Sequence, residues 1–181
     1  GQPNAMGGRE VGGLSNMLAA HMNIEDPQHR DWVQSFWQSP TICQSPGLKA
    51  VDMFNAIKQG KIKAVWIMAT NPLVSMPNRR EIIEALQQCE LVIVSDCVDK
   101  NDTLAFADVK LPATTWGEKN GTVTNSERRI SRQRPVMPAP GKARHDWQII
   151  CDVAKKMGFE EHFDFQHPSQ IFAEHDRLSG F

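Results

Sequence analysis

Apolar residues form two nearly continuous runs near the middle of the chain, at residues 64–68 (AVWIM) and 91–94 (LVIV). Strands that are buried on both faces of a parallel sheet have this pattern, whereas half-buried strands alternate between apolar and polar residues. The two runs therefore predict parallel strands. Small polar residues follow each run, at 70–72 (TNP) and 95–96 (SD). Because open parallel sheets bind ligands at the carboxyl ends of their strands, these residues form the first candidate site.

Helical periodicity surrounds the two predicted strands. Leu48, Val51, Phe54 and Ile57 recur at steps of three residues, which predicts an amphipathic helix over residues 48–59. This helix leads into the first strand, so helix and strand alternate along the chain. That order implies a right-handed parallel crossover.

A second helix is predicted between the two strands, over residues 78–89. Asn78 and Glu81 have the spacing of a capping box, in which each of the two side chains accepts a hydrogen bond from the backbone N–H of the other residue. The remaining pattern predicts further helices at 27–37, at 145–157 and from 169, a third strand at 109–111, and a turn at 120–121 next to a ribbon strand within 122–131.

These elements predict an α/β fold. With 181 residues, the chain is long enough for one well-buried domain. We expect a single three-layer, parallel-sheet (Rossmann-like) domain over residues 1–181. An irregular lead-in rich in glycine and proline would occupy residues 1–46, and the core would occupy residues 47–158. The early glycines do not form a G-x-G-x-x-G fingerprint and instead predict a loop that packs closely against other structure.

Charge and hydropathy narrow the possible partners. The formal net charge of −1 gives no electrostatic reason to expect nucleic acid or an anionic membrane as a partner. Four arginines do fall within residues 128–134. They have two interpretations: charges that protect a strand edge from pairing, or guanidinium groups that contact an anion. No apolar stretch approaches membrane-spanning length and no signal peptide is visible.

Neither the cysteines nor the histidines follow a metal-binding pattern. The four cysteines lie far apart, without the spacing of a zinc site or of a disulfide framework. We therefore expect free, mostly buried thiols in a reducing compartment, and no metal ligands in this chain. The cysteines are Cys43, Cys89, Cys97 and Cys151.

Residues 111–122 (LPATTWGEKNGT) and 125–129 (NSERR) carry a pattern that resembles the molybdopterin oxidoreductases. Further matches span nearly the whole chain in the order of that family. They are 1–5 (GQPNA), 9–12 (REVG), 69–72 (ATNP), 94–96 (VSD), 107–112 (ADVKLP) and 145–148 (HDWQ). Within the family the resemblance is strongest to the catalytic subunits of bacterial assimilatory nitrate reductases, and the formate dehydrogenase large subunits are near neighbours.

The resemblance implies a fold, a cofactor and site residues. The fold would be the third domain of the formate dehydrogenase/dimethyl sulfoxide reductase architecture. The cofactor would be molybdenum bis(molybdopterin guanine dinucleotide), held here by the guanine nucleotide part. The motifs assign cofactor contacts to Asn71, Ser95, Asp96, Lys119 and Asp146.

The chemistry of these residues suits a guanine nucleotide. A carboxylate accepts hydrogen bonds from the N1 and N2 donors of guanine, and a lysine supplies a point charge for a diphosphate. Asp96 and Asp146 are both candidates for the base, and the sequence leaves the choice open. Asp146 has a second interpretation, as the N-cap of a helix that begins at Trp147.

Other parts of the family's machinery are missing from the sequence. The cysteines cannot ligate a 4Fe–4S cluster, and none matches a molybdenum ligand. The chain also begins without Met inside a glycine-rich run, so we interpret it as an internal piece of a longer protein. The cluster and the metal ligands would lie elsewhere in that parent, and the isolated piece would not turn over nitrate.

The resemblance implies a parent that reduces nitrate to nitrite in the cytoplasm. Its partners would be nitrate, the remaining domains of the same polypeptide, and an electron-donor protein or subunit. Two alternatives remain open at this point. The chain could be a piece of a formate dehydrogenase large subunit, or a nucleotide-binding module without catalytic function.

Overall fold

The computed structural model describes residues 5–180, which form two compact units. Unit 1 comprises the described parts of Gly1–Leu48, Asn120–Arg134 and Phe165–Phe181, and unit 2 comprises Lys49–Lys119 and Pro135–Asp164. The predicted boundary between lead-in and core, at 46/47, lies close to the first boundary between the units. The expectation of one domain over 1–181 stays a prediction. Most of the GQPNA match lies outside the described residues.

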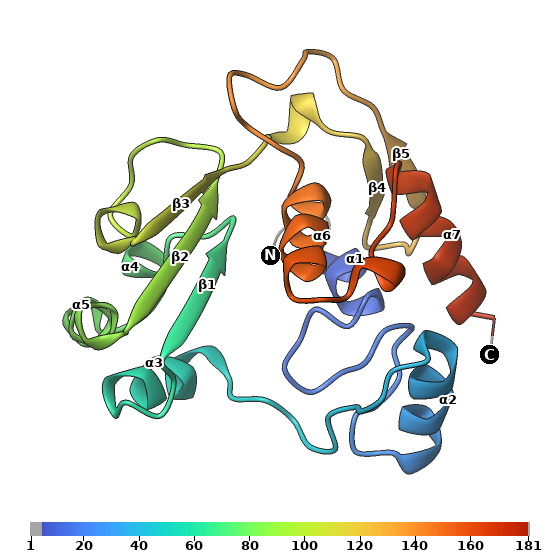
Figure 1. The fold of residues 1–181 in the computed structure, drawn as a ribbon, viewed down its shortest axis with the longest axis horizontal. Helices are drawn as coiled ribbons and strands as arrows, with labels where there is room; N and C mark the ends of the chain where they lie inside the picture. The colour runs from blue at the N-terminus through green and yellow to red at the C-terminus, as the bar shows by residue number, and fades with distance from the viewer. Residues whose placement is uncertain (1–4, 181) are drawn as a thin grey trace. The chain divides into compact units, whose positions relative to one another are not determined.

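Unit 2 is built on a parallel sheet of three strands in the order β1-β2-β3. The strands are β1 (Ala64–Met68), β2 (Leu91–Asp96) and β3 (Val109–Pro112), and they point the same way in Figure 1. Met68 lies opposite Ser95, so the carboxyl ends of neighbouring strands coincide. The prediction of parallel strands at these positions is confirmed.

Three helices cover one face of this sheet (Figure 1). They are α3 (Ala50–Lys58), α4 (Pro72–Ser75) and α5 (Arg79–Gln88). Their apolar side chains meet alternate residues of β1 and β2, as the two-residue period of a strand requires. The resulting core contains Phe54, Ile57, Val65, Ile67, Leu73, Ile82, Ala85, Leu86, Val92, Val94 and Leu104. A third layer on the opposite face stays a prediction.

The burial of α3 differs from the sequence prediction. Phe54 and Ile57 are buried, but Leu48 and Val51 are 53% and 49% exposed. The helix begins only at Ala50, so Leu48 precedes it. A helix repeats every 3.6 residues, so each step of three drifts by about 60° around the axis and carries Val51 off the buried face.

The predicted capping box at the start of α5 is wrong. Asn78 adopts a left-handed conformation with φ of 54°, and its side chain makes no capping hydrogen bond. An N-cap that bonds its own helix has extended backbone, which points the side chain at the first free N–H groups. Here Arg79 secures this end instead, donating to the Leu73 carbonyl and to Asp102 at 3.2 and 2.8 Å.

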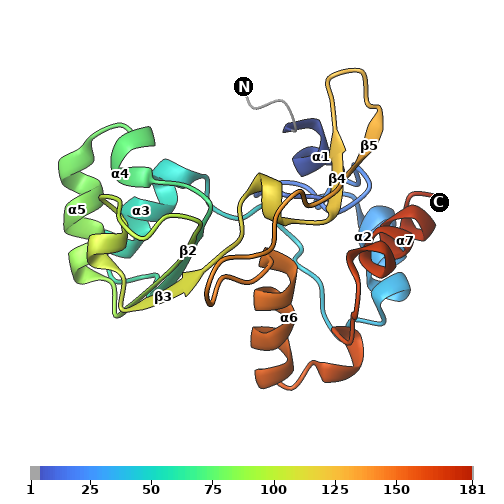
Figure 2. The same ribbon diagram turned by 90° about the horizontal axis from the view of Figure 1, so that it is seen from above.

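Unit 1 combines helices with an antiparallel hairpin. The helices are α1 (Ala5–Glu10), α2 (Pro27–Trp37) and α7 (Pro168–Leu178), and the hairpin consists of β4 (Gly121–Thr124) and β5 (Ile130–Gln133). Figure 2 shows the two hairpin strands side by side. The core of the unit contains Leu18, Ala19, Met22, Ile24, Val33 and Leu178.

Two predictions in unit 1 have opposite outcomes. Helix α2 begins and ends where the sequence predicts, because the Asp26 carboxylate accepts from the Gln28 N–H at 2.8 Å and proline occupies the first turn. The predicted turn at 120–121 is wrong. The chain reverses at 125–129, where the Asn125 side chain accepts from the N–H groups of Glu127 and Arg129, each at 3.0 Å.

A buried carboxylate joins α1 to the hairpin. Glu10 is 7% exposed. Its oxygens accept from Thr124 Oγ1 and from Arg128 Nε, each at 3.3 Å, and His21 Nε2 lies 3.7 Å away. Residues 5–10 therefore form a helix packed on β4, where the sequence predicts an irregular loop. The predicted close packing is found at Gly12, whose φ is +77° and where a Cβ would lie 2.6 Å from a backbone carbon.

The remaining helical elements belong to unit 2. They are α6 (Asp146–Lys156) and the 3₁₀ turns η1 (Leu104–Phe106), η2 (Trp116–Glu118) and η3 (Glu160–His162). Among residues 5–180, no helix combines the length and the apolar character needed to cross a membrane.

Candidate functional site at the carboxyl edge of the sheet

Four segments of unit 2 end at one edge of the sheet. Strands β1 and β3 each continue by one backbone hydrogen bond to β2 beyond their last residue, and the segment before α6 joins the far side of β3 by a parallel bridge. The five predicted contacts belong to these segments or follow them: Asn71 lies in the loop after β1, Ser95 and Asp96 end β2, Lys119 follows η2, and Asp146 begins α6. The bonds run from Ala69 N to Ser95 O (2.9 Å), from Ala113 N to Asp96 O (2.9 Å), and from Thr114 N to Arg144 O (3.0 Å).

The loop after β1 holds Asn71 in a defined orientation. Ala69 turns the chain with φ of +54°, a left-handed conformation that is uncommon outside glycine and asparagine. Asn71 directly precedes α4 and is half-buried. Its Oδ1 accepts a hydrogen bond from Thr103 Oγ1 at 2.7 Å.

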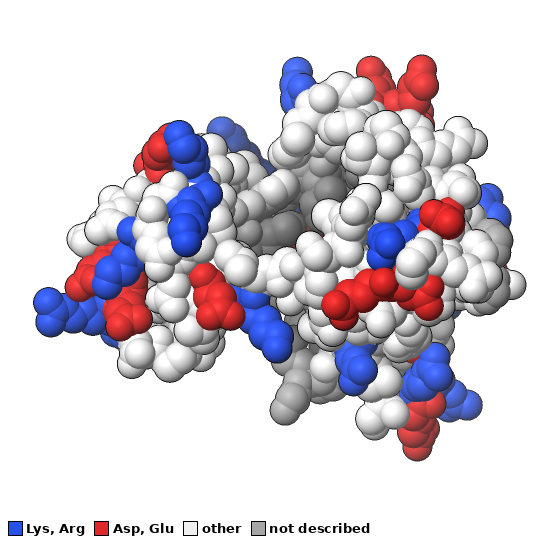
Figure 3. Space-filling model, turned by 90° about the horizontal axis from the view of Figure 1, so that it is seen from below, with Lys and Arg blue, Asp and Glu red and all other residues white. Residues whose placement is uncertain are grey.

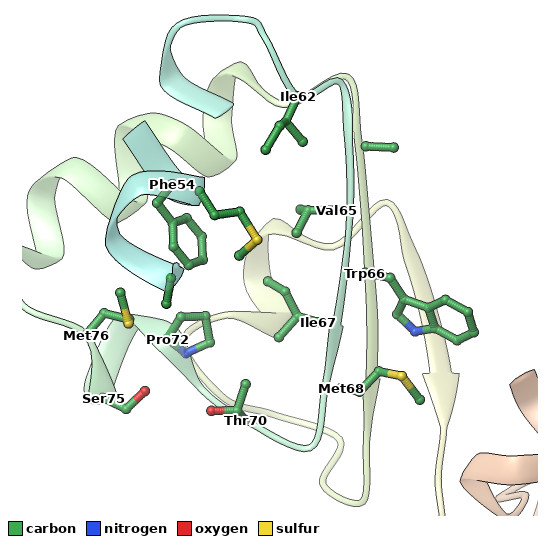
Figure 4. A pocket seen from close by; sticks show the side chains of 13 residues that line it. Phe54, Ile62, Val65, Trp66, Ile67, Met68, Thr70, Pro72, Ser75 and Met76 are labelled. Carbon is green, nitrogen blue, oxygen red and sulfur yellow. The ribbon is translucent and has the colours of Figure 1, made fainter. Parts of the chain in front are cut away.

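Ser95 has a different position from the other predicted contacts. Its side chain is fully buried, and its Oγ accepts a hydrogen bond from the Trp66 indole Nε1 at 2.8 Å. Trp66 and Met68 project from the side of β1 opposite to Val65 and Ile67 (Figure 4). In this conformation Ser95 holds Trp66 against the sheet, and direct contact with a ligand stays a prediction.

Asp96 ends β2 and is half-buried. Its Oδ1 accepts from the Cys97 N–H at 2.7 Å, and its Oδ2 accepts from Asn101 Nδ2 at 2.8 Å. Each carboxylate oxygen can accept a second hydrogen bond. The group is thus oriented by the protein and still has acceptor capacity.

The structure brings two predicted contacts together as an ion pair. Lys119 Nζ lies 2.6 Å from Asp146 Oδ2, and the two side chains are 29% and 30% exposed. The alternative that Asp146 is an N-cap is wrong: helix α6 begins at Asp146 and its N-cap is His145. The N–H of His145 donates to Gln148 Oε1 at 3.4 Å, and a ring nitrogen of His145 lies 3.0 Å from Thr114 Oγ1.

Sequence reasoning did not identify the residues that orient these contacts. Thr103, Asn101 and Trp66 each bond a predicted contact, yet no sequence motif assigned a role to any of them. Polar residues soon after the Ser-Asp pair were the available signal. They could not be matched to partners, because Asn71 and Thr103 are 32 positions apart in the sequence.

A pocket of about 420 Å³ lies near the site but is not the site. It is lined by residues of β1, by Phe54 and Met53 of α3, and by Met76 after α4 (Figure 4). The lining is mostly apolar, and of the loop between β1 and Asn71 only Thr70 reaches it. The predicted polar contacts lie outside it, so the pocket lacks the convergent polar groups of a nucleotide site.

Charges of both signs intersperse on the face drawn in Figure 3. Within the described residues 5–180, no group of three or more His, Cys, Asp or Glu side chains could hold a metal ion. The cysteines are all free, but the expectation of mostly buried thiols is wrong for two of them. Cys43 and Cys97 are exposed, Cys89 is half-buried and Cys151 is buried.

Burial raises the pKa of the Cys151 thiol, against a smaller opposing effect of Lys155. A raised pKa means less thiolate at a given pH, and the thiolate is the form that alkylating agents attack. In the native chain at pH 8 we expect iodoacetamide to label Cys43 and Cys97 at least tenfold faster than Cys151, by peptide mass spectrometry. Equal labelling in urea is the control, and equal rates in the native chain would contradict the assignment.

Comparison with known proteins identifies the family. The sequence profile of the family described as "Molybdopterin oxidoreductase" matches residues 4–156. The chain belongs to this family. Membership implies a molybdenum–pterin cofactor, in agreement with the motifs at 69–72, 94–96 and 111–122.

The sequence relatives include proteins named as nitrate reductases. The chain is 58% identical over 181 residues to "Nitrate reductase" of Klebsiella oxytoca, covering 100% of this chain and 21% of the relative. It is 35% identical over 175 residues to "Assimilatory nitrate reductase catalytic subunit" of Bacillus subtilis, covering 96% of this chain and 24% of the relative. The chain thus spans about a fifth of the length of the first of these relatives.

A solved structure supports the fold. The chain superposes on "Acetylene Hydratase from Pelobacter acetylenicus" with a TM-score of 0.63 at 19% sequence identity, covering 99% of this chain and 23% of that one. Identity this low shows the shared fold alone. It agrees with a mixed α/β chain built on a three-stranded parallel sheet.

Proposed function

We propose that the protein to which this chain belongs reduces nitrate to nitrite. The graded similarity to named relatives carries this proposal. Relatives called nitrate reductase are 58% to 34% identical to the chain, whereas those called "F420-dependent formate dehydrogenase" are 34% to 32% identical. Expression of the full-length protein, assayed with nitrate and with formate, tests it. Activity with formate alone would favour a formate dehydrogenase.

Within that protein, we propose that this chain binds the guanine nucleotide part of a molybdopterin guanine dinucleotide. It would do so as the third domain of the formate dehydrogenase/dimethyl sulfoxide reductase architecture. The support is the set of donors and acceptors at the carboxyl edge of the sheet. Asp96 keeps acceptor capacity for the guanine N1 and N2 donors, and Lys119 keeps two protons beyond the one directed at Asp146.

The residues present fit the nucleotide end of such a cofactor and not its metal end. Asn71 would add an amide donor at the mouth of the β1 loop. The molybdenum centre, when bound, would supply the oxygen-atom and electron transfer, while the protein orients the cofactor. In the parent protein, this chain would work together with the remaining domains of the polypeptide, a 4Fe–4S cluster and an electron donor, with nitrate as the substrate. We propose a cytoplasmic location for that protein.

Calorimetric titration of the 181-residue chain with GDP tests the binding role. We expect saturable binding of GDP and at least tenfold weaker binding of ADP, because adenine lacks the N1–H and N2–H donors that Asp96 would accept. Equal affinity for both nucleotides would argue against base recognition by a carboxylate. Absence of GDP binding would overturn the binding role for this chain.

A further inference from the structure

The loop between β2 and η1, residues 97–103, contacts two of the predicted cofactor residues. Thr103 bonds Asn71, and Asn101 bonds Asp96. Both bonds join side chain to side chain, and neither Thr103 nor Asn101 belongs to the set assigned by motif. One loop therefore orients two of the predicted contacts, one in the loop after β1 and the other at the end of β2.

The hydrogen-bond direction at Asn71 follows from the surroundings of Thr103. The Thr103 hydroxyl is fully buried and accepts the Leu73 N–H at 3.5 Å, the long limit of a hydrogen bond. A hydroxyl has a single proton, and at 2.7 Å the Asn71 amide is the partner for it. If the amide were flipped, its Nδ2 would donate to Thr103, and the hydroxyl proton would be left buried without an acceptor. Such a group costs about 1–3 kcal/mol, so Oδ1 faces Thr103.

This orientation makes Asn71 a donor toward the edge of the sheet. Its Oδ1 is occupied by Thr103, and its Nδ2 has no hydrogen-bond partner among residues 5–180. An amide with a free NH₂ group suits an acceptor such as a phosphate oxygen or a base carbonyl. The same side chain without Thr103 could present either its donor or its acceptor.

The neighbours of Asn101 likewise determine which of its amide atoms faces Asp96. Its Oδ1 accepts the Leu104 N–H at 2.7 Å, so its Nδ2 is the atom that donates to Asp96 at 2.8 Å. Asp96 is thus held by neutral donors. Asp146, in contrast, is paired with the Lys119 ammonium at 2.6 Å. Asp96 is therefore the carboxylate whose charge has no cationic partner within the described chain.

We propose that Thr103 and Asn101 are positioning residues that preset the polarity of the site, making Asn71 a donor and Asp96 an uncompensated acceptor. The proposal rests on the proposed binding of a guanine nucleotide. It also selects Asp96, rather than Asp146, as the carboxylate that accepts from the base. Preorganisation of this kind raises affinity because the groups need no reordering when the ligand binds.

A double-mutant cycle on GDP affinity tests Thr103. We expect Thr103→Val, which keeps the shape and removes the hydroxyl, to weaken GDP binding by about five- to tenfold. Thr103→Ser restores the hydroxyl and should bind within about twofold of the wild type. In an Asn71→Ala background, Thr103→Val should have no further effect. An equal loss in both backgrounds would mean that Thr103 supports the loop in general, and would overturn the assignment.

The second arm tests Asn101 and separates the two levels of the proposal. Asn101→Ala should weaken GDP binding by about three- to tenfold, whereas Asp99→Ala, an exposed position of the same loop, should leave it unchanged. Thermal denaturation of every variant reports whether it is folded. If the wild-type chain binds GDP, and the Thr103→Val and Asn101→Ala variants bind it with unaltered affinity, the positioning role alone is refuted. A wild-type chain that does not bind GDP refutes the binding role and this assignment together.

Discussion

Asp96→Ala is expected to weaken GDP binding by about 30- to 100-fold. Hydrogen bonds to a charged group contribute about 1.5–3 kcal/mol, and each 1.4 kcal/mol corresponds to a factor of ten in affinity. The carboxylate ends β2 with both oxygens oriented, by Cys97 N–H and by Asn101. Its removal would leave the guanine donors without an acceptor in a half-buried position.

The matched control for this variant is Asp99→Ala. This substitution also removes one carboxylate, three residues after Asp96, but Asp99 is exposed and makes no hydrogen bond or ion pair within the described chain. Its GDP affinity should stay within about twofold of the wild type, since long-range effects of one exposed charge are screened by salt. Calorimetric titrations at matched ionic strength give both affinities. Unchanged affinity in Asp96→Ala would show that another group reads the base.

Ile57→Ala is expected to destabilise unit 2 by about 2–5 kcal/mol, the range for truncation of a fully buried isoleucine. Ile57 has 0% exposure and packs from α3 against the core residues of β1 and β2. The loss combines the transfer of the removed methyl and methylene groups with the cavity that they leave. Native-state hydrogen exchange at the amides of β2 measures this, because it reports opening of unit 2 even when unit 1 unfolds separately.

Val51→Ala provides the comparison within the same helix. Val51 is 49% exposed, although the three-residue spacing predicts it on the buried face. We expect a change within about 0.5 kcal/mol, as for most substitutions at exposed positions. Similar destabilisation by the two variants would mean that α3 packs in another rotation. The pair therefore checks the orientation of the helix as well as the core.

Local signals were sufficient to predict several elements of the fold. Strands β1 and β2 appear in the sequence as uninterrupted apolar runs. In the structure their alternate residues are buried under the helices, and the residues between these are mostly half-buried. The start of helix α2 is determined by its N-cap Asp26 and by the proline that follows. In each case the decisive interactions lie within a few residues of one another. The parallel arrangement follows as well, since helix–strand alternation leaves few other topologies.

Errors in the prediction occur where a local sequence signal competes with other contacts, some close in the sequence and some distant. Asn78 is a residue type that favours N-caps, yet the start of α5 is held by bonds from Arg79 to Leu73 of α4 and to Asp102 of the loop after β2. The hairpin turn falls at 125–129, where Asn125 can bond two N–H groups, and not at 120–121. The lead-in contains a helix because Glu10 meets Thr124 of the hairpin, 114 positions later in the chain.

The site shows the same division between local and long-range information. Residue types in consecutive positions were enough to indicate the family, the parallel strands and the polar residues that follow them. The pairing of these residues became known from the folded chain, in which Lys119 bonds Asp146, Asn101 bonds Asp96 and Thr103 bonds Asn71. Hydrogen-bond direction depends on the full set of neighbours around each atom, and the fold alone brings together neighbours that lie far apart in the sequence.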